Sequence, residues 1–286
     1  MHIKSVLIID VDNTLFDWVR FWRASFGALV DSILASAPGL DRQRLLEEIR
    51  RIHRRVGTSE YAFILQDLRP VTGEFGIGPA EEQRAIQAYR DARALTLELY
   101  PGVRDTLLAV KAQNGRIVGF TESTGYHTAD RLAKLGLDGV VDAIYSPPDY
   151  SIPQSVDITR IRTREPSEYH LKRTRHELVP GGFKKPDAVL LGSIMAREEV
   201  RPADAVYVGD SISRDVAMAQ RASVLDVYAE YGRAGVAEVA AFLLAVSHWT
   251  DDELAAAYSK AVLPTITLHE SLSELLTYVA FQKGEP

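Results

Sequence analysis

The sequence predicts an α/β protein in which a doubly wound, Rossmann-like parallel sheet carries an inserted helical cap domain. Two observations lead to this fold class. Short apolar runs rich in β-branched residues alternate with segments of helical periodicity, which is the pattern of βαβ units. The segment 15–99 interrupts the alternation, because it contains several helical patterns and no convincing strand.

The predicted elements of the sheet can be assigned in order along the chain. Three segments between the strands have apolar residues at helical spacing. They are residues 102–115, 124–137 and 186–200, and Pro186 suits the first turn of the last one. Six apolar runs have the length and composition of strands; they are residues 4–10, 115–120, 142–146, 204–210, 223–229 and 265–269.

The helical interruption is expected to form a separate lobe. We therefore assign residues 15–99 to the cap, and residues 1–14 with 100–286 to the α/β core. The cap contains four helical patterns, at residues 17–37, 42–55, 59–68 and 81–95. In the first pattern, four aromatic residues recur near helical spacing, which favours packing between cap helices over a substrate platform. These residues are Trp18, Phe21, Trp22 and Phe26.

Within the core, residues 147–183 form a predicted irregular insertion. A long segment without secondary structure is uncommon in a compact domain and is often functional. We expect either a solvated surface excursion or a contact with an anionic substrate or a neighbouring subunit. The second interpretation depends on a basic cluster formed by Arg160, Arg162, Arg164, Lys172, Arg173 and Arg175.

Composition narrows the class of protein. The chain has 286 residues, a net charge of −6 and no cysteine. Disulfides and thiolate metal sites are therefore ruled out, and a general nucleic-acid or membrane-surface binder is disfavoured. The N-terminus lacks the apolar centre of a signal peptide, and no apolar run reaches the roughly 20 residues of a membrane span. We expect a cytoplasmic protein without a nucleic-acid or membrane partner, and a homodimer remains open.

Two acids follow the first predicted strand, in the stretch SVLIIDVDNTLFDW. Residues two apart on a strand share a face, so Asp10 and Asp12 are expected to point the same way. Ligands of open parallel sheets bind beyond the carboxyl ends of the strands, where this pair would lie. An acid pair at this place can also form a turn or a helix N-cap, a role that Asn13 and Thr14 would suit.

Other polar residues are predicted at the same edge of the sheet. Thr121 ends the second long strand, and Asp210 ends another, with Asp215 five residues later. Lys184 and Lys185 come immediately before the proline that precedes a helical pattern. Each of these residues could serve only as a cap or a solvated loop residue. Several acids, a hydroxyl and a lysine at one edge are nevertheless difficult to explain by capping alone.

These residues carry a resemblance to the haloacid dehalogenase (HAD) superfamily. Its four motifs are matched in order by DVDNT, the Thr121 of GFTES, the Lys185 of FKKPD, and GDSISRD. We prefer Lys185 to Lys184 because the family lysine commonly precedes a proline. The helical insertion after the first strand resembles the cap of a phosphatase branch. Two departures concern the substrate: Glu122 follows the threonine where many relatives carry asparagine, and the 147–183 segment is longer than usual.

The resemblance implies a Mg²⁺-dependent phosphomonoester hydrolase that acts on a small phosphorylated metabolite. In this interpretation Asp10 is the nucleophile that forms an aspartyl-phosphate, and Asp12 is the general acid and base. Thr121 and Lys185 would hold the phosphoryl oxygens. Asp10 and Asp210 would hold the metal, with the backbone carbonyl of Asp12 assisting and Asp215 as a further ligand or support.

Three alternatives remain open at this stage. A phosphomutase has the same core residues and is poorly separated by sequence. The haloacid dehalogenases themselves need no metal and resemble one another in lacking the second aspartate, so Asp12 favours phosphate chemistry. A catalytically silent relative that binds a phosphorylated ligand or a partner is disfavoured, because the acid pair, threonine, lysine and second acidic motif are all present.

Overall fold

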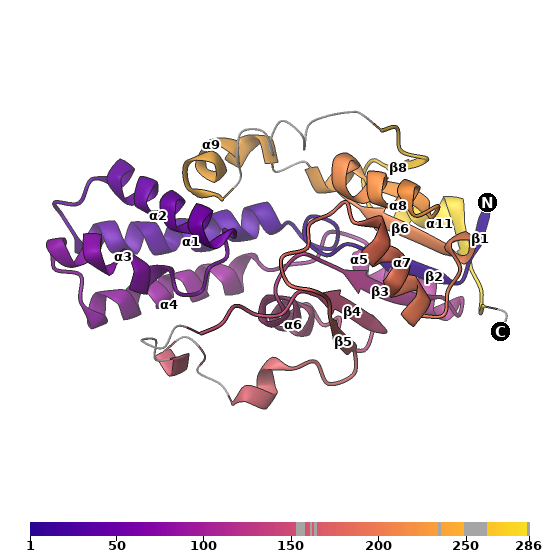
Figure 1. Ribbon diagram of the computed structural model, residues 1–286, viewed down its shortest axis with the longest axis horizontal. Coiled ribbons are helices and arrows are strands. Elements are labelled where there is room, and N and C mark those ends of the chain that lie inside the picture. Colours follow the sequence, from indigo (N-terminus) through magenta and orange to yellow (C-terminus); the bar gives the residue numbers. More distant parts are fainter. Residues whose placement is uncertain (153–157, 161, 163–164, 234–235, 249–261, 285–286) are drawn as a thin grey trace.

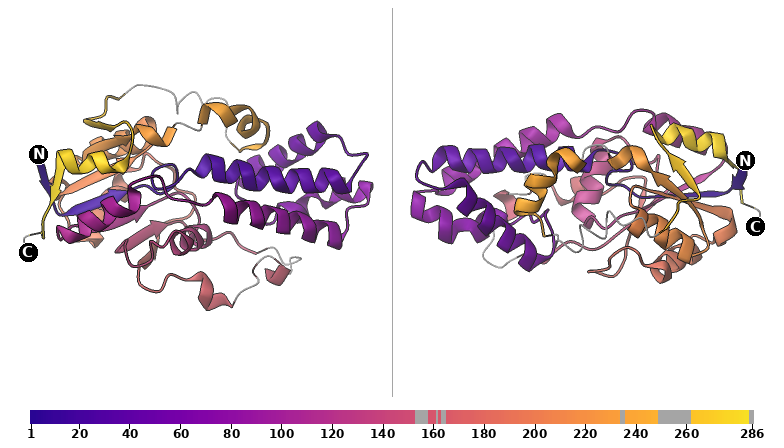
Figure 2. Two further views of the ribbon diagram at one scale, coloured as in Figure 1. Left: turned by 180° about the vertical axis from the view of Figure 1, so that it is seen from behind. Right: turned by 90° about the horizontal axis from the view of Figure 1, so that it is seen from above.

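The computed structural model describes residues 1–152, 158–160, 162, 165–233, 236–248 and 262–284. The described parts form an elongated molecule with the sheet at one end and a group of long helices at the other (Figure 1). The N-terminus lies at the end of the molecule that is remote from these helices (Figure 2).

The core is built on a parallel sheet of seven strands in the order β5-β4-β3-β2-β6-β7-β8. The chain runs outward from β2 through β3, β4 and β5, and then returns to the other side of β2 to place β6, β7 and β8. The strand order therefore reverses beside β2, and ligands of such sheets bind at this switch point. The strands are β2 (Val6–Ile9), β3 (Arg116–Phe120), β4 (Ala143–Ser146), β5 (Arg175–Leu178), β6 (Ala205–Gly209), β7 (Leu225–Ala229) and β8 (Ile266–Leu268).

Helices cover both faces of this sheet, as predicted. Leu7 and Ile9 of β2 pack into a cluster with α5, α6 and α11, whereas Val6 and Ile8 pack with α7 and α8. This alternation follows from the two-residue period of a strand. The five helices are α5 (Val103–Ala112), α6 (Gly125–Lys134), α7 (Ala188–Arg197), α8 (Ala217–Arg221) and α11 (Leu275–Tyr278).

Three strands have no counterpart in the sequence prediction. β1 (His2–Lys4) and β9 (Val279–Phe281) form a separate two-stranded parallel sheet. β5, with the sequence RHEL, lies inside the segment expected to be irregular. It is an edge strand with half-exposed and exposed residues, so it lacks the apolar run by which buried strands are recognised.

Helix starts also differ from the prediction at two places. α7 begins at Ala188, and its N-cap is Asp187, whose side chain accepts a hydrogen bond from the Leu190 amide. Pro186 therefore precedes the helix and does not occupy its first turn. The pattern predicted at 59–68 becomes helical only at Ile64, where α3 (Ile64–Thr72) begins. The residues before it form a loop that faces the core.

The long helices at the other end form a layer with its own apolar centre. Trp22 and Phe26 stack at 5.3 Å within this centre, as expected for cap packing. Phe21 instead belongs to the core cluster, and Trp18 packs against both clusters, so the aromatic stripe spans the junction. The helices are α1 (Trp18–Ser36), α2 (Arg42–Val56), α3 and α4 (Pro79–Thr96).

A helix from the C-terminal part of the chain joins these helices. α9 (Val236–Val246) lies in the range assigned to the core, but its residues Leu243 and Val246 are buried among the cap residues. His53 of α2 hydrogen-bonds the carbonyl of Val246 through Nδ1 at 2.6 Å. This packing supports adding α9 to the proposed cap; the domain limits themselves remain a prediction.

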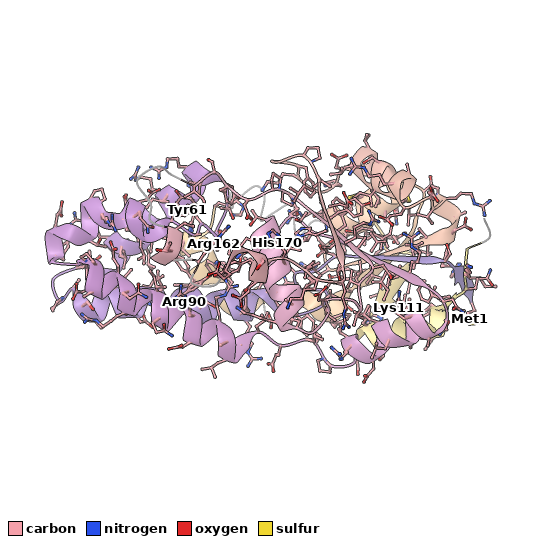
Figure 3. The ribbon with its side chains drawn as sticks, turned by 90° about the horizontal axis from the view of Figure 1, so that it is seen from below. Met1, Tyr61, Arg90, Lys111, Arg162 and His170 are labelled. Atoms are coloured by element: carbon pink, nitrogen blue, oxygen red, sulfur yellow. The ribbon has the colours of Figure 1, made fainter. Side chains whose placement is uncertain are left out.

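The described residues of the segment 147–174 lie along the junction of cap and core. Tyr150 contacts Tyr61 of the cap with 6.5 Å between ring centroids, and Arg162 lies 4.4 Å from the ring centroid of Tyr126 in the core. Figure 3 shows Arg162 and His170 of this segment between the two ends of the molecule. Arg164, part of the predicted basic cluster, lies outside the described residues. The proposed contact of this cluster with an anionic substrate or a subunit remains a prediction.

No helix among the described residues has the length and apolar character needed to cross a membrane.

Candidate active site

The carboxyl ends of three neighbouring strands bring the predicted residues to one edge of the sheet. Asp10 follows β2, Thr121 follows β3 and Asp210 follows β6. The amide of Asp10 continues the ladder by donating to the carbonyl of Val208 at 2.9 Å. Parallel strands end on the same side, so local sequence and strand order together place these side chains near one another.

Lys185 reaches the same place from the segment before α7. Its Nζ donates to Asp10 Oδ1 at 2.5 Å and to Asp215 Oδ1 at 2.9 Å. The side chain is buried, whereas that of Lys184 is exposed. Burial by itself lowers the pKa of Lys185, but the carboxylates of Asp10 and Asp215 outweigh it and hold this pKa well above the usual value. Of the two lysines, only Lys185 therefore contacts the acids.

A π-helix positions Asp215. It spans Ile212–Val216 and returns the chain so that the Asp215 carboxylate lies beside Gly209. A Cβ atom at Gly209 would lie 2.4 Å from Asp215 Cγ, so a larger residue there would displace the acid. Asp215 also accepts hydrogen bonds from the hydroxyl of Tyr207 at 2.9 Å and from the amide of Ser211 at 3.1 Å. π-helical turns of this kind are frequent at functional sites.

Asp10, Asp210 and Asp215 form a cluster suited to a divalent cation. Each offers a carboxylate oxygen, and these oxygens lie within 4.8 Å of one another. No hydrogen bond or ion pair with another described residue reaches the Asp210 carboxylate. Burial raises the pKa of Asp10 to about 7, with Lys185 opposing the rise and Asp215 adding to it. Burial raises the pKa of Asp210 well above its usual value, and the neighbouring carboxylates of Asp215 and Asp10 add to the rise.

This set of ligands fits Mg²⁺. Mg²⁺ prefers carboxylate oxygen ligands, and its charge would compensate three acids that, among the described residues, form ion pairs only with Lys185. The Asp210 carboxylate has no hydrogen-bond or ion-pair partner within the part of the chain that the structure describes, and this observation points most directly to a cation.

Asp12 belongs to a different group of side chains. Its Oδ2 accepts a hydrogen bond from Ser123 Oγ at 2.6 Å and a longer one from Thr121 Oγ1 at 3.5 Å. Its Oδ1 accepts from Arg131 at 3.0 Å. Burial raises the pKa of Asp12, Arg131 opposes the rise and Glu60 adds to it. The Asp12 side chain is thus not part of the three-acid cluster; a metal contact through its backbone carbonyl remains a prediction.

Sequence reasoning missed the partners of Asp12. Ser123 is two residues after Thr121, so it could have been found by extending the motif. Arg131 is fully buried on α6, and Glu60 comes from the cap loop between α2 and α3. Arg131 forms an ion pair with Glu60. Nothing in the local pattern around either residue indicates this contact, because they are 71 positions apart.

Glu122, noted in the sequence as a departure from many relatives, also has specific partners. Its Oε1 accepts a hydrogen bond from the amide of Lys185 at 3.2 Å, and its Oε2 pairs with Arg214. Glu122 therefore anchors the backbone of the segment that carries Lys185. Arg214 in turn belongs to the π-helix that carries Asp215.

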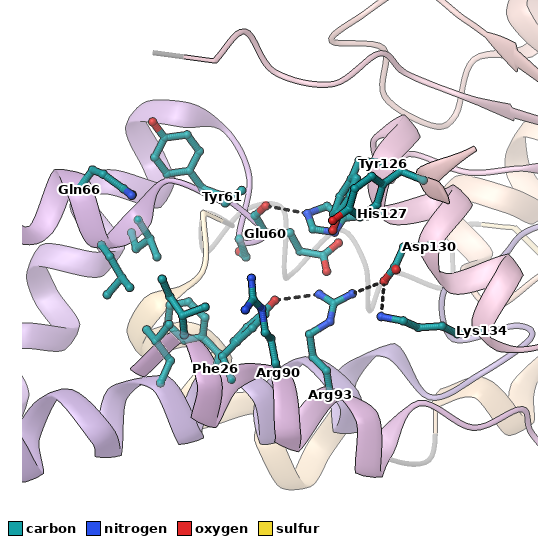
Figure 4. Close-up of a pocket in the computed structure, with 18 residues that line it drawn as sticks. Phe26, Glu60, Tyr61, Gln66, Arg90, Arg93, Tyr126, His127, Asp130 and Lys134 are labelled. Atoms are coloured by element: carbon teal, nitrogen blue, oxygen red, sulfur yellow. Dashed lines mark hydrogen bonds and ion pairs between the residues drawn. The ribbon is translucent and has the colours of Figure 1, made fainter. Parts of the chain in front are cut away.

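A cavity of about 430 Å³ lies next to this group, between α1, α3 and α4 of the cap and α6 of the core (Figure 4). Phe26, Ile64 and Ile86 are among its apolar lining residues. On its polar side, Arg93 and Lys134 both contact Asp130, at 3.4 and 2.8 Å. Glu60 also lines the cavity and so connects it with the partners of Asp12.

Comparison with known proteins identifies similar chains. Phosphoglycolate phosphatase 1 of Pseudomonas aeruginosa is 27% identical over 235 residues, which are 81% of this chain and 71% of that protein. Glyceraldehyde 3-phosphate phosphatase of Methanopyrus kandleri is 23% identical over 238 residues, covering 81% of this chain and 85% of that protein.

The fold also resembles solved structures. YfnB of Bacillus subtilis, solved with bound magnesium, has a TM-score of 0.52 at 14% sequence identity, covering 96% of this chain and 97% of that chain. At this identity the likeness concerns the fold alone. A model of the haloacid dehalogenase-like hydrolases matches residues 4–223, which include all of the predicted site residues. This chain therefore belongs to the haloacid dehalogenase-like hydrolase family.

Proposed function

We propose that this protein is a Mg²⁺-dependent phosphomonoester hydrolase that acts on a small phosphorylated metabolite. One arrangement carries the proposal: Asp10 lies against a buried lysine and within a cluster of three acids, while Asp12 is held nearby with a raised pKa. The names of two relatives, both phosphatases of small phosphorylated compounds, support the same chemistry.

The proposed reaction has two displacements at phosphorus. In the first, an oxygen of Asp10 attacks phosphorus, the ester P–O bond breaks, and Asp12 gives a proton to the departing oxygen. In the second, a water molecule attacks phosphorus and gives a proton to Asp12, while the bond between phosphorus and the Asp10 oxygen breaks. Inorganic phosphate leaves, and both carboxyl groups regain their starting states. A carboxyl group with a raised pKa suits the proton-donating role.

The remaining residues hold the phosphoryl group and the metal. Lys185 would contribute a positive charge to the phosphoryl oxygens, and Thr121 a hydroxyl donor. Asp10, Asp210 and Asp215 would hold Mg²⁺, assisted by the backbone carbonyl of Asp12. When bound, the metal would neutralise charge that develops on the phosphoryl oxygens.

The proposal is tested by phosphate release from p-nitrophenyl phosphate, measured with Mg²⁺ and after its removal. We expect turnover that needs Mg²⁺ and is abolished in Asp10→Asn, because the amide is a poor nucleophile. Lys184→Met is the control, since this exposed lysine touches none of the acids. Turnover that survives unchanged in Asp10→Asn would exclude the aspartyl-phosphate route.

The same assay separates the competing functions. A panel that includes phosphoglycolate and glyceraldehyde 3-phosphate, compared by kcat/KM, would identify the substrate class. A phosphomutase would convert a sugar phosphate to its isomer without releasing phosphate. A dehalogenase would release halide from a 2-haloacid without a metal. A protein that binds phosphorylated ligands but turns over none would be a silent relative.

A further inference from the structure

The carboxylate of Asp12 is held on both of its oxygens. Ser123 Oγ donates to one oxygen at 2.6 Å, and Arg131 donates to the other at 3.0 Å. Arg131 also donates to Ser123 Oγ at 3.0 Å, so the three side chains form a closed ring. A carboxylate held at both oxygens has little freedom to rotate. Its direction therefore depends on where the guanidinium of Arg131 lies.

The position of Arg131 depends in turn on Glu60. Arg131 is fully buried on α6, between the rings of Phe16 at 5.7 Å and Phe21 at 5.3 Å. A buried guanidinium requires charged partners. Its two ion-pair partners among the described residues are Asp12 and Glu60. Asp12 accepts a hydrogen bond from Nη1 of Arg131, and Glu60 accepts one from Nη2.

Glu60 is the member of this group that the cap contributes. It lies in the loop between α2 and α3, and its backbone carbonyl also contacts Nε2 of His127 in α6 at 3.2 Å. Separation of the cap from the core would remove Glu60 from Arg131. The guanidinium would then lose one of its two counter-charges, and its place beside Asp12 would no longer be fixed by two ion pairs.

We infer that Arg131 is a positioning residue for Asp12, and that Glu60 makes this positioning depend on contact between cap and core. The inference rests on the proposed function and adds that proton transfer by Asp12 requires contact between cap and core. Asp12 is correctly oriented to give its proton to the leaving oxygen only when the cap closes the site. Proton transfer is thereby linked to the exclusion of bulk water.

A second cap–core ion pair provides a matched control. Arg93 of α4 pairs with Asp130 of α6 at 3.4 Å and lies 4.7 Å from the ring centroid of Phe21. This ion pair joins α6, the helix that carries Arg131, to the cap. Arg93 and Asp130 are both buried, but neither residue contacts Asp12. Asp130→Asn should therefore lower the share of molecules in which the cap is closed, but in each closed molecule Glu60 still holds Arg131 beside Asp12.

The experiment measures kcat/KM for a series of aryl and alkyl phosphates whose leaving groups range from good to poor. Poor leaving groups need a proton from Asp12, whereas p-nitrophenolate hardly does. We expect Arg131→Met to lower kcat/KM for the poor leaving groups by about 10²-fold more than for p-nitrophenyl phosphate. Glu60→Gln should show a smaller loss of the same kind, and Arg131→Lys should recover part of it.

Two comparisons make the result specific. Asp130→Asn should shift the whole series by one common factor, because fewer molecules are closed but each closed molecule keeps Glu60 and Arg131 in place beside Asp12. In an Asp12→Asn background, Arg131→Met should add little, since two residues acting in one step are not additive. Circular dichroism and thermal unfolding check that each variant is folded. If Arg131→Met does not fold, Arg131→Lys and Glu60→Gln supply the same comparison.

The outcomes separate this inference from the function on which it rests. A wild type that turns over the series, combined with a uniform loss in the Arg131 and Glu60 variants, would overturn the inference and leave the hydrolase proposal standing. A wild type that turns over no phosphate ester would overturn both. A loss confined to poor leaving groups, shared with Asp12→Asn and absent from Asp130→Asn, would support the inference.

Discussion

Asp10 and Asp12 are separated by one residue, yet the structure surrounds them differently. Asp10 pairs with Lys185, which also pairs with Asp215, and all three belong to the core. Asp12 pairs with Arg131, whose second partner, Glu60, belongs to the cap. The proposed nucleophile is therefore positioned by the core alone, whereas the proposed acid depends on the cap as well.

The largest expected effect tests whether the two carboxylates differ in role. Asp10→Asn should lower kcat by about 10⁴-fold or more for every leaving group, because no aspartyl-phosphate can form. Asp12→Asn should slow the first displacement much less for p-nitrophenyl phosphate than for alkyl phosphates. Rapid-quench trapping of the labelled phosphoenzyme measures this step. Equal losses in both variants across the series would remove the distinction.

Mg²⁺ binding should depend on the three-acid cluster and not on the side chain of Asp12. Chelation of Mg²⁺ is expected to lower turnover by about 10³-fold, which corresponds to several kcal/mol of charge stabilisation. By isothermal titration calorimetry, Asp210→Asn should weaken Mg²⁺ binding by at least about 10-fold. Asp12→Asn should bind Mg²⁺ nearly as wild type does, since its side chain lies outside the three-acid cluster. Comparable weakening in both variants would place the Asp12 side chain among the ligands.

The core group should also respond to loss of its lysine. Lys185→Met leaves the buried carboxylates of Asp10 and Asp215 without their cation, and should lower the free energy of unfolding by about 3 kcal/mol in metal-free protein. Lys184→Met, at the exposed neighbouring position, should change it by less than about 0.5 kcal/mol. Urea unfolding measures both. Added Mg²⁺ should restore part of the loss in Lys185→Met if the acids bind the metal.

The smallest expected effect concerns the cap. Burial lowers the pKa of His53 to about 4, with the carbonyl of Val246 opposing the shift. The unfolded chain therefore binds a proton below about pH 6.5 that the folded chain resists down to about pH 4. Stability should fall as the pH is lowered through this window, by about 2 kcal/mol at pH 5 for this residue.

His53→Gln keeps a hydrogen-bond donor but cannot titrate, so urea unfolding of this variant should show a weaker pH dependence. His127 at the junction has a pKa lowered by burial in the same direction, to about 4, and should account for a similar share. An acid-induced loss of stability that His53→Gln leaves unchanged would show that α2 and α9 separate before His53 is protonated.

Much of the core could be predicted from the sequence. Six of the seven strands of the main sheet were recognised because buried parallel strands are short continuous apolar runs, and Asp10, Thr121 and Asp210 follow from their ends. The missed strand of this sheet lacks that signal, because β5 is RHEL at the sheet edge. α9 was recognised neither as a helix nor as a companion of α1 and α2, because a helical pattern does not say which partner buries it.

The sequence by itself determined six of the seven strands of the main sheet, the helical insertion and the placement of Asp10, Thr121 and Asp210 at one edge. These depend on local periodicity and on the rule that parallel strands end together. Only the tertiary structure decided what surrounds Asp12. Arg131 is 119 positions from Asp12 and 71 from Glu60, so it meets the first through packing of α6 against the sheet and the second through packing of cap against core, which no local pattern encodes.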